Sequence, residues 1–93
     1  MHLIQSNLFK KAYKKLQKNT RHIVNETIKM VMENTEIGIL KVGDLAGIRV
    51  HKFKHHPHMY LLAYEYTKET NTLYLIALGE HQNFYEKMKR HLT

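Results

Sequence analysis

Cysteine is absent from this chain of 93 residues, proline occurs once and glycine four times. Without a thiol the chain forms no disulfide and no thiolate zinc site, and it has no cysteine nucleophile. Its stability must come from packing, as suits a protein of the reducing cytoplasm. A chain this short buries only about two thirds of its unfolded surface, which allows one modest core. We therefore expect a single domain over residues 1–93.

Long apolar runs are also missing. No segment approaches the roughly 20 apolar residues that a membrane-spanning helix needs, and the first residues, MHLIQ, lack the charged-then-apolar layout of a signal peptide. We expect a soluble, cytoplasmic protein without membrane contact.

Acidic residues are scarce, since eight Asp and Glu stand against fifteen Lys and Arg, for a formal charge of +7. A charge excess of this size attracts polyanions such as RNA through phosphate contacts and counterion release, and it attracts acidic proteins as well. Charge alone does not distinguish a polyanion from an acidic protein as the partner. Solubility is a third explanation of the positive charge.

The first half of the chain carries two apolar series at helical spacing. Residues 2–4 predict a short edge strand, and the polar pair 6–7 can cap the helix that follows. Apolar residues then recur every three or four positions over residues 8–16, and again over 23–34 after an interruption at 19–20. Because the linker is so short, we expect the two helices to form an antiparallel hairpin.

The second half supplies a sheet. Residues 35–46 carry bend signals and predict a loop. Three runs rich in β-branched and aromatic residues follow, at 48–54, 60–66 and 73–78. Their short polar connections predict antiparallel neighbours, and the third run, apolar on both faces, predicts a central strand that Gly79 ends. Residues 84–92 resume helical spacing.

These elements together predict an α+β fold. A two-helix hairpin cannot bury its own apolar stripe, so it must pack on something flat. We expect an N-terminal α-helical hairpin on one face of a small, mainly antiparallel β-sheet, followed by a C-terminal helix.

Histidines gather in one segment of the second half, at His51, His55, His56 and His58. Imidazole is the commonest metal ligand in proteins. This cluster, however, has no helical i, i+4 pair and no carboxylate or thiolate, and Lys52 and Lys54 would repel a cation. A basic hairpin turn explains it better, and we expect no metal site.

Two other patterns have ordinary explanations as well. The tyrosines alternate along the predicted strands, which favours core packing over base stacking; they are Tyr60, Tyr64, Tyr66 and Tyr74. The lysines on the outer side of the first helix, Lys10 and Lys14 among them, form either a solvated face or a polyanion contact.

Arg49 and His51 are harder to explain by packing. They alternate with Ile48 and Val50, so the polar pair leaves one face of the strand and the apolar pair the other. We expect the apolar pair to face the helical hairpin, which puts Arg49 and His51 on the uncovered face.

His81 and Tyr85 form a second polar pair just after the last strand. They are four residues apart, hence on one face of the helix if the helix has begun by His81. If the first and third strands are neighbours, both pairs converge. A guanidinium, two imidazoles and a phenol can bind a phosphodiester, transfer protons and stabilise a pentacovalent transition state without a metal or other cofactor.

The sequence resembles the RelE/ParE superfamily of bacterial toxins over essentially its whole length. The element order matches, as do three short motifs: GDLAGIR at 43–49, YLLAY at 60–64 and LGEHQNFY at 78–85. The resemblance implies a compact toxin of a type II toxin–antitoxin system, neutralised by a cognate acidic antitoxin. For the RelE/YafQ-like branch it implies a ribosome-dependent endoribonuclease, which cuts mRNA in the ribosomal A site and lies against ribosomal RNA.

Site roles follow from the resemblance as expectations. His81 falls where YafQ-like members carry a catalytic histidine, and Tyr85 where they carry an aromatic residue. Arg49 and His51 fall where RelE has basic residues on its first long strand. The implied chemistry is attack by a ribose 2′-hydroxyl, with His81 and His51 as acid and base in either order, Arg49 stabilising charge and Tyr85 orienting the substrate. We expect the RNA-binding lysines to be Lys52, Lys54, Lys10 and Lys14.

Two departures from RelE leave other functions open. Leu61 and Asn83 stand where RelE carries arginines. The ParE branch has the same fold, lacks the nuclease residues and poisons DNA gyrase. A non-catalytic, basic nucleic-acid-binding module is the third alternative.

Overall fold

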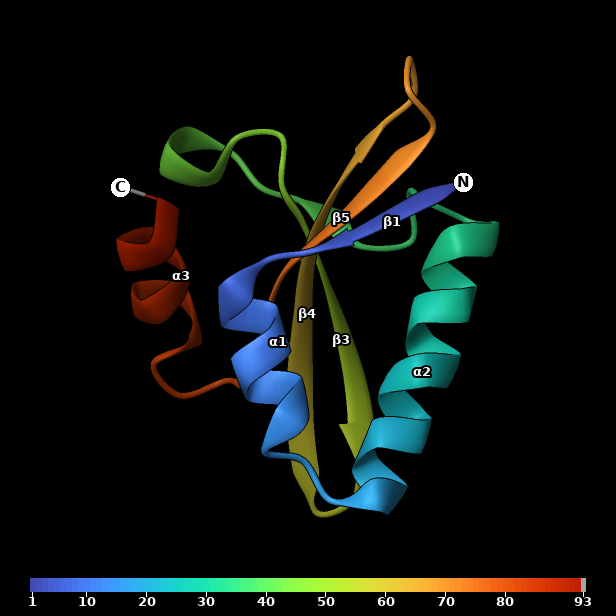
Figure 1. Ribbon diagram of the computed structural model, residues 1–93. Coiled ribbons are helices and arrows are strands. Elements are labelled where there is room, and N and C mark those ends of the chain that lie inside the picture. The colour runs from blue at the N-terminus through green and yellow to red at the C-terminus, as the bar shows by residue number, and fades with distance from the viewer. Residues whose placement is uncertain (93) are drawn as a thin grey trace.

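The computed structural model describes residues 1–92, and it has a mixed α/β fold in which one five-stranded sheet lies between helices (Figure 1). The elements in chain order are β1 (His2–Gln5), α1 (Asn7–Lys14), α2 (Lys18–Glu33), β2 (Ile39–Leu40), the 3₁₀ turn η1 (Gly43–Leu45), β3 (Arg49–His55), β4 (His58–Thr67), β5 (Thr72–Glu80) and α3 (Phe84–Leu92). None of the helices in residues 1–92 is long and apolar enough to cross a membrane.

The strands are arranged in the order β1-β5-β4-β3-β2. All neighbours are antiparallel except β1 and β5, which run parallel. The expected mainly antiparallel sheet is confirmed, and so is the edge strand at the N-terminus. β5 is an interior strand between β1 and β4, as expected for the run 73–78, and β4 separates β3 from β5, so these two are not neighbours.

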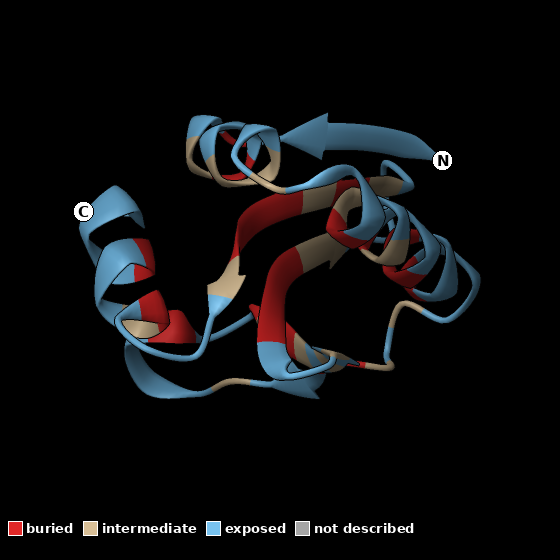
Figure 2. Cartoon of the chain, turned by 90° about the horizontal axis from the view of Figure 1, so that it is seen from below, coloured by how far each residue is buried: buried red, intermediate tan, exposed pale blue. Residues whose placement is uncertain are grey.

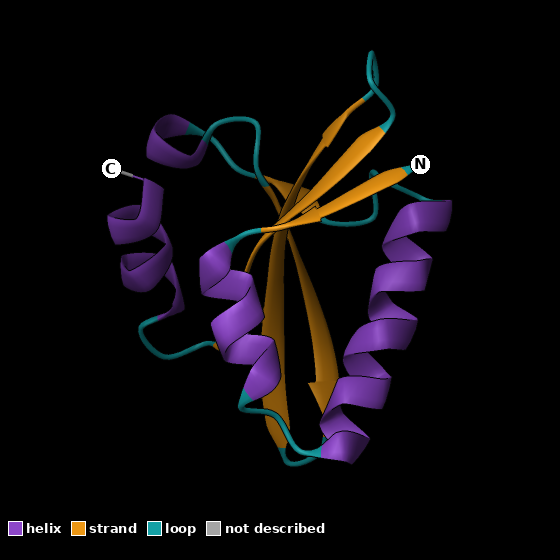
Figure 3. Ribbon diagram, in the orientation of Figure 1, coloured by secondary structure: helices purple, strands orange, loops and turns teal. Residues whose placement is uncertain are grey.

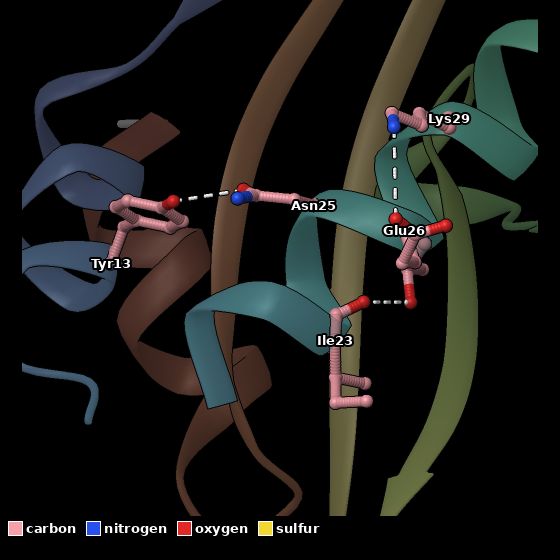
Figure 4. Close-up of polar contacts among 6 residues, drawn as sticks. Tyr13, Ile23, Asn25, Glu26 and Lys29 are labelled. Atoms are coloured by element: carbon pink, nitrogen blue, oxygen red, sulfur yellow. Dashed lines mark hydrogen bonds and ion pairs between the residues drawn. The ribbon is translucent and has the colours of Figure 1, made fainter. Parts of the chain in front are cut away.

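The helical hairpin is confirmed (Figure 3). Ser6 caps α1, because its Oγ accepts a hydrogen bond from the Phe9 amide at 2.9 Å. The Tyr13 hydroxyl joins the two helices by donating to Asn25 Oδ1 at 2.8 Å (Figure 4). The expected interruption at residues 19–20 is wrong: both lie inside α2, and the chain turns at 15–17.

Both faces of the sheet are covered, as the buried segments in Figure 2 illustrate. A first core lies under α1 and α2, and its buried members include Phe9, Val24, Val31, Leu62 and Leu75. A second core lies under η1 and α3, and its members include Leu45, Val50, Leu61, Phe84 and Met88. The expectation of an uncovered sheet face is therefore wrong, because η1 and α3 occupy the side that the hairpin leaves.

Two further details differ from the sequence-based expectation. Residues 39–40 form the short edge strand β2 inside the segment expected to be a loop. Gly79 lies within β5, which runs on to Glu80, so the glycine does not end the strand.

Candidate active site

Arg49 and His51 point toward the helical hairpin. Arg49 is paired with Tyr64 across β3 and β4, and His51 with Leu62. Directly paired residues of an antiparallel sheet share a face, and both partners belong to the first core. Val50, between the two, belongs to the second core. The two polar side chains do share one face of β3 as expected, but it is the face that the hairpin covers.

Arg49 is bonded to the loop that follows α2. Its Nη1 donates to the carbonyl oxygen of Gly38 at 2.9 Å and to that of Glu36 at 3.4 Å. The hydroxyl of the fully buried Tyr64 accepts a hydrogen bond from the Gly38 amide at 2.9 Å and donates to the Thr35 carbonyl at 2.8 Å. We name these contacts the loop clamp; they hold residues 35–38 against the sheet, and they engage Nη1 of the guanidinium.

His51 is half-buried on the same face. Desolvation lowers the pKa of its imidazole from the ordinary value of 6.5, because burial disfavours the charged form.

Lys52 and Lys54 lie on the opposite face of β3, which is the face of α3. Lys52 is paired with Leu61, a buried member of the second core, and Lys54 follows two residues later on the same side. Both lysines are exposed. Lys52 and Lys54 are therefore the basic residues of β3 that lie on the sheet face covered by α3.

His81 and Tyr85 lie together as expected, although α3 begins at Phe84 and His81 lies in the turn before it. Their rings meet edge-on with centroids 6.3 Å apart. Tyr85 also packs edge-on against Phe84 at 5.3 Å, and the Nζ of Lys41 lies 5.3 Å from its ring centroid. Tyr85 is thus held against the second core while its neighbour His81 is exposed.

The register brings the lysine pair and the His81–Tyr85 pair to one end of the sheet. Lys52, Leu61 and Gly79 form one row across β3, β4 and β5. At about 4.8 Å per strand, the outer Cα atoms of that row are about 10 Å apart. His81 follows Gly79 by two residues, beside this row.

The expected convergence of all four residues is therefore wrong. His81 and Tyr85 come together, whereas Arg49 and His51 lie on the other face, and β4 separates the strands that carry the two pairs. The structure brings Lys52 and Lys54 to the side of His81 and Tyr85 in their place.

A hollow of about 740 Å³ opens beside His81, between α1, the β3–β4 turn, the end of β5 and the start of α3. Lys11, Lys15 and Lys87 line it, together with apolar side chains such as Leu8. We call it the α1–α3 hollow. Lys10 and Lys14, which were expected to bind RNA, are exposed but do not line it. Lys11 and Lys15 flank the apolar stripe of α1. This position in the sequence marks them as lining residues of the hollow only once the position of α3 is known.

The remaining histidines of the β3–β4 segment lie at the turn. The Nδ1 of His58 is 2.6 Å from Glu80 Oε1, and its ring meets Tyr60 edge-on. Within the described residues, 1–92, no three histidine or acidic side chains gather closely enough to hold a metal ion.

Solved structures with the same architecture define the class of fold. A double-arginine mutant of E. coli toxin RelE in the free state superposes with a TM-score of 0.74 at 19% identity, covering 99% of this chain and 97% of that one. RelBE2 of Mycobacterium tuberculosis, a toxin–antitoxin complex, gives 0.72 at 17% identity, with 86% of this chain and 96% of that one covered. The intact E. coli RelBE complex gives 0.70 at 21%, with 87% and 96% covered. The fold is that of the RelE toxins.

A family model places the chain more narrowly. The model of the ParE-like toxins of type II bacterial toxin–antitoxin systems matches residues 3–89. The chain belongs to this family, and the resemblance to the RelE/ParE superfamily is confirmed. No curated protein sequence matches the chain significantly.

Proposed function

We propose that this toxin is an mRNA endoribonuclease that acts on the ribosome in the cytoplasm. The observation that supports the proposal is the placement of Lys52 and Lys54 on the same face, and at the same end of the sheet, as His81 and Tyr85. A cationic surface beside an exposed imidazole and a supported phenol is a set of groups suited to phosphodiester cleavage.

In the proposed reaction the ribose 2′-oxygen attacks the adjacent phosphorus while the bond from phosphorus to the 5′-oxygen breaks. His81 moves one of the two protons: it either takes the proton of the 2′-hydroxyl or gives one to the leaving 5′-oxygen. Lys52 and Lys54 stabilise the charge on the phosphorane oxygens. Tyr85 orients the substrate. The step requires a 2′-hydroxyl, so RNA is cut and DNA is not.

Arg49 and His51 stay outside this proposed site. Arg49 holds the loop clamp through two backbone carbonyls, and His51 faces the hairpin. The second proton transfer then falls to water, to the substrate or to a group that the ribosome supplies.

A cognate antitoxin is the protein partner that we propose. The superposed E. coli RelBE and M. tuberculosis RelBE2 structures are toxin–antitoxin complexes, and a formal charge of +7 favours an acidic antitoxin.

Poisoning of DNA gyrase without nuclease activity is the second candidate. Leu61 is fully buried at a position where the resemblance implies an arginine, and the neutral Asn83 stands at the other such position. The family model that matches is also named after ParE.

Cleavage of mRNA by purified toxin and ribosomes tests the proposal. We expect His81→Ala to abolish cleavage and Tyr85→Phe to reduce it, while His22→Ala, an exposed histidine on α2, serves as the matched control. If His81→Ala and Tyr85→Phe arrest growth as fast as the parent while mRNA stays intact, the nuclease proposal fails and a gyrase supercoiling assay follows. A parent chain that is harmless without antitoxin would favour a non-catalytic binding module instead.

A further inference from the structure

The α1–α3 hollow carries a concentrated positive charge from two helices. Lys11 and Lys15 line it from α1, and Lys87 lines it from α3. Its one lining carboxylate, that of Glu80, is engaged by His58 at 2.6 Å. An anion that enters the hollow therefore meets three lysines, and the nearest opposing charge already has a partner.

The walls of the hollow suit a flat, partly apolar group. Leu8, Ala12 and Phe84 are among its apolar lining residues, and Gln82 and Asn83, whose side chains end in amides, also line it. Amides carry both donors and acceptors, as the edge of a nucleobase does. The combination of lysines, apolar side chains and amide groups in one lining matches a nucleotide, in which phosphate, base face and base edge are joined.

The spacing of the lysines suits a strand rather than one phosphate. Lys11 and Lys15 are one turn of α1 apart, or about 6 Å along the helix, so they can meet successive anionic groups. Lys87 faces them from the other wall. His81 also lines the hollow, so a strand lying in it reaches the proposed site directly.

We propose that the α1–α3 hollow binds the single-stranded RNA next to the cleaved bond, with Lys11, Lys15 and Lys87 on its phosphates. The inference rests on the proposed function, since it takes the strand in the hollow to be the substrate of His81. It assigns RNA binding on α1 to Lys11 and Lys15 rather than to Lys10 and Lys14.

Equilibrium binding tests this assignment without requiring cleavage. The probe is a short, fluorescently labelled, fully 2′-O-methylated RNA, which cannot be cut by 2′-hydroxyl attack. Its affinity is measured by anisotropy between about 50 and 200 mM salt. The test variant is Lys11→Ala with Lys15→Ala, and the matched variant is Lys10→Ala with Lys14→Ala, which removes the same charge from the same helix. Circular dichroism checks that both remain folded.

The slope of log affinity against log salt gives the result. Each phosphate contact in a single strand contributes about 0.7 to the slope. We therefore expect the slope to fall by about 1.4 in the Lys11/Lys15 variant and by about 0.7 in Lys87→Ala. The slope of the Lys10/Lys14 variant should fall by less than half as much as that of the Lys11/Lys15 variant. Equal losses in the two pairs would overturn the proposal.

Two further outcomes separate this inference from its alternatives. If the Lys11/Lys15 variant binds the RNA normally but no longer binds a polyglutamate peptide, the hollow is a protein-binding site and the RNA assignment is wrong. If the unmodified chain cleaves mRNA but the two lysine-pair variants have the same salt slope, RNA binding in the hollow is refuted and the proposed function stands. If the two lysine-pair variants differ in salt slope but the unmodified chain does not cleave mRNA, the proposed function is refuted, and the hollow is an RNA-binding site without nuclease activity.

Discussion

Removing the hydroxyl of Tyr64 tests the loop clamp most directly. The side chain is fully buried, and its oxygen bonds to the Gly38 amide at 2.9 Å and to the Thr35 carbonyl at 2.8 Å. Tyr64→Phe keeps the ring and deletes both hydrogen bonds. The buried Gly38 amide then lacks this partner, which costs about 1–3 kcal/mol, whereas the half-buried Thr35 carbonyl can turn to water at little cost.

We therefore expect Tyr64→Phe to lower the free energy of unfolding by about 2 kcal/mol. A domain of this size has roughly 5–14 kcal/mol in total, and the expected fall in Tm is about 8–16 °C. Urea unfolding followed by circular dichroism should show a lower midpoint at an unchanged m-value. Tyr66→Phe is the control, because its hydroxyl bonds to Asn71 at the surface, and we expect a change within about 0.5 kcal/mol. Equal effects of the two substitutions would refute the reasoning.

Three other predictions follow from the same structure. Arg49→Met should lower the free energy of unfolding by about 1–3 kcal/mol through loss of its bonds to two carbonyls, while mRNA cleavage per folded molecule stays within tenfold of the parent chain. Unchanged stability together with a loss of cleavage would instead make Arg49 a catalytic residue. Because the pKa of His51 is lowered in the folded chain, the unfolded chain binds more protons below pH 6.5, and the free energy of unfolding should fall on acidification through that range. The urea midpoint of His51→Gln should fall less over the same range. An equal fall in both chains would contradict the assignment of this pH dependence to His51. A zinc-selective chelator at constant Mg²⁺ should leave cleavage unchanged in the ribosome assay, and inhibition would point to a metal.

Much of the fold could be predicted because local signals are strong in this chain. Ser6 stands before an apolar helical series and does cap α1. The run at 73–78 is apolar on both faces and does become a strand with neighbours on both sides. The two-residue strand β2 was missed because alternation cannot be read over so short a segment.

The site was harder to predict because it depends on contacts between distant segments. Alternation correctly put Arg49 and His51 on one face of β3, but a sheet with two cores offers each face an apolar partner, and alternation does not choose between them. The short connections correctly predicted that consecutive strands pair, which puts β4 between β3 and β5. The convergence of the two polar pairs instead required the first and third of these strands to be neighbours, and they are not. The expectation for His81 and Tyr85 survived because the two residues are close in sequence and need no such choice, although His81 lies in the turn before α3.

Stability and the proposed toxicity of this chain depend on different residues. Changes at the loop clamp act on folding, whereas changes at His81, Lys11 or Lys15 act on exposed side chains. If the proposed function is correct, we expect a His81→Ala variant to be harmless yet folded, so that it can be produced in quantity without its antitoxin. Such a variant would serve as bait for the antitoxin and the ribosome, while a clamp variant would show how unstable a toxin can become before the cell removes it.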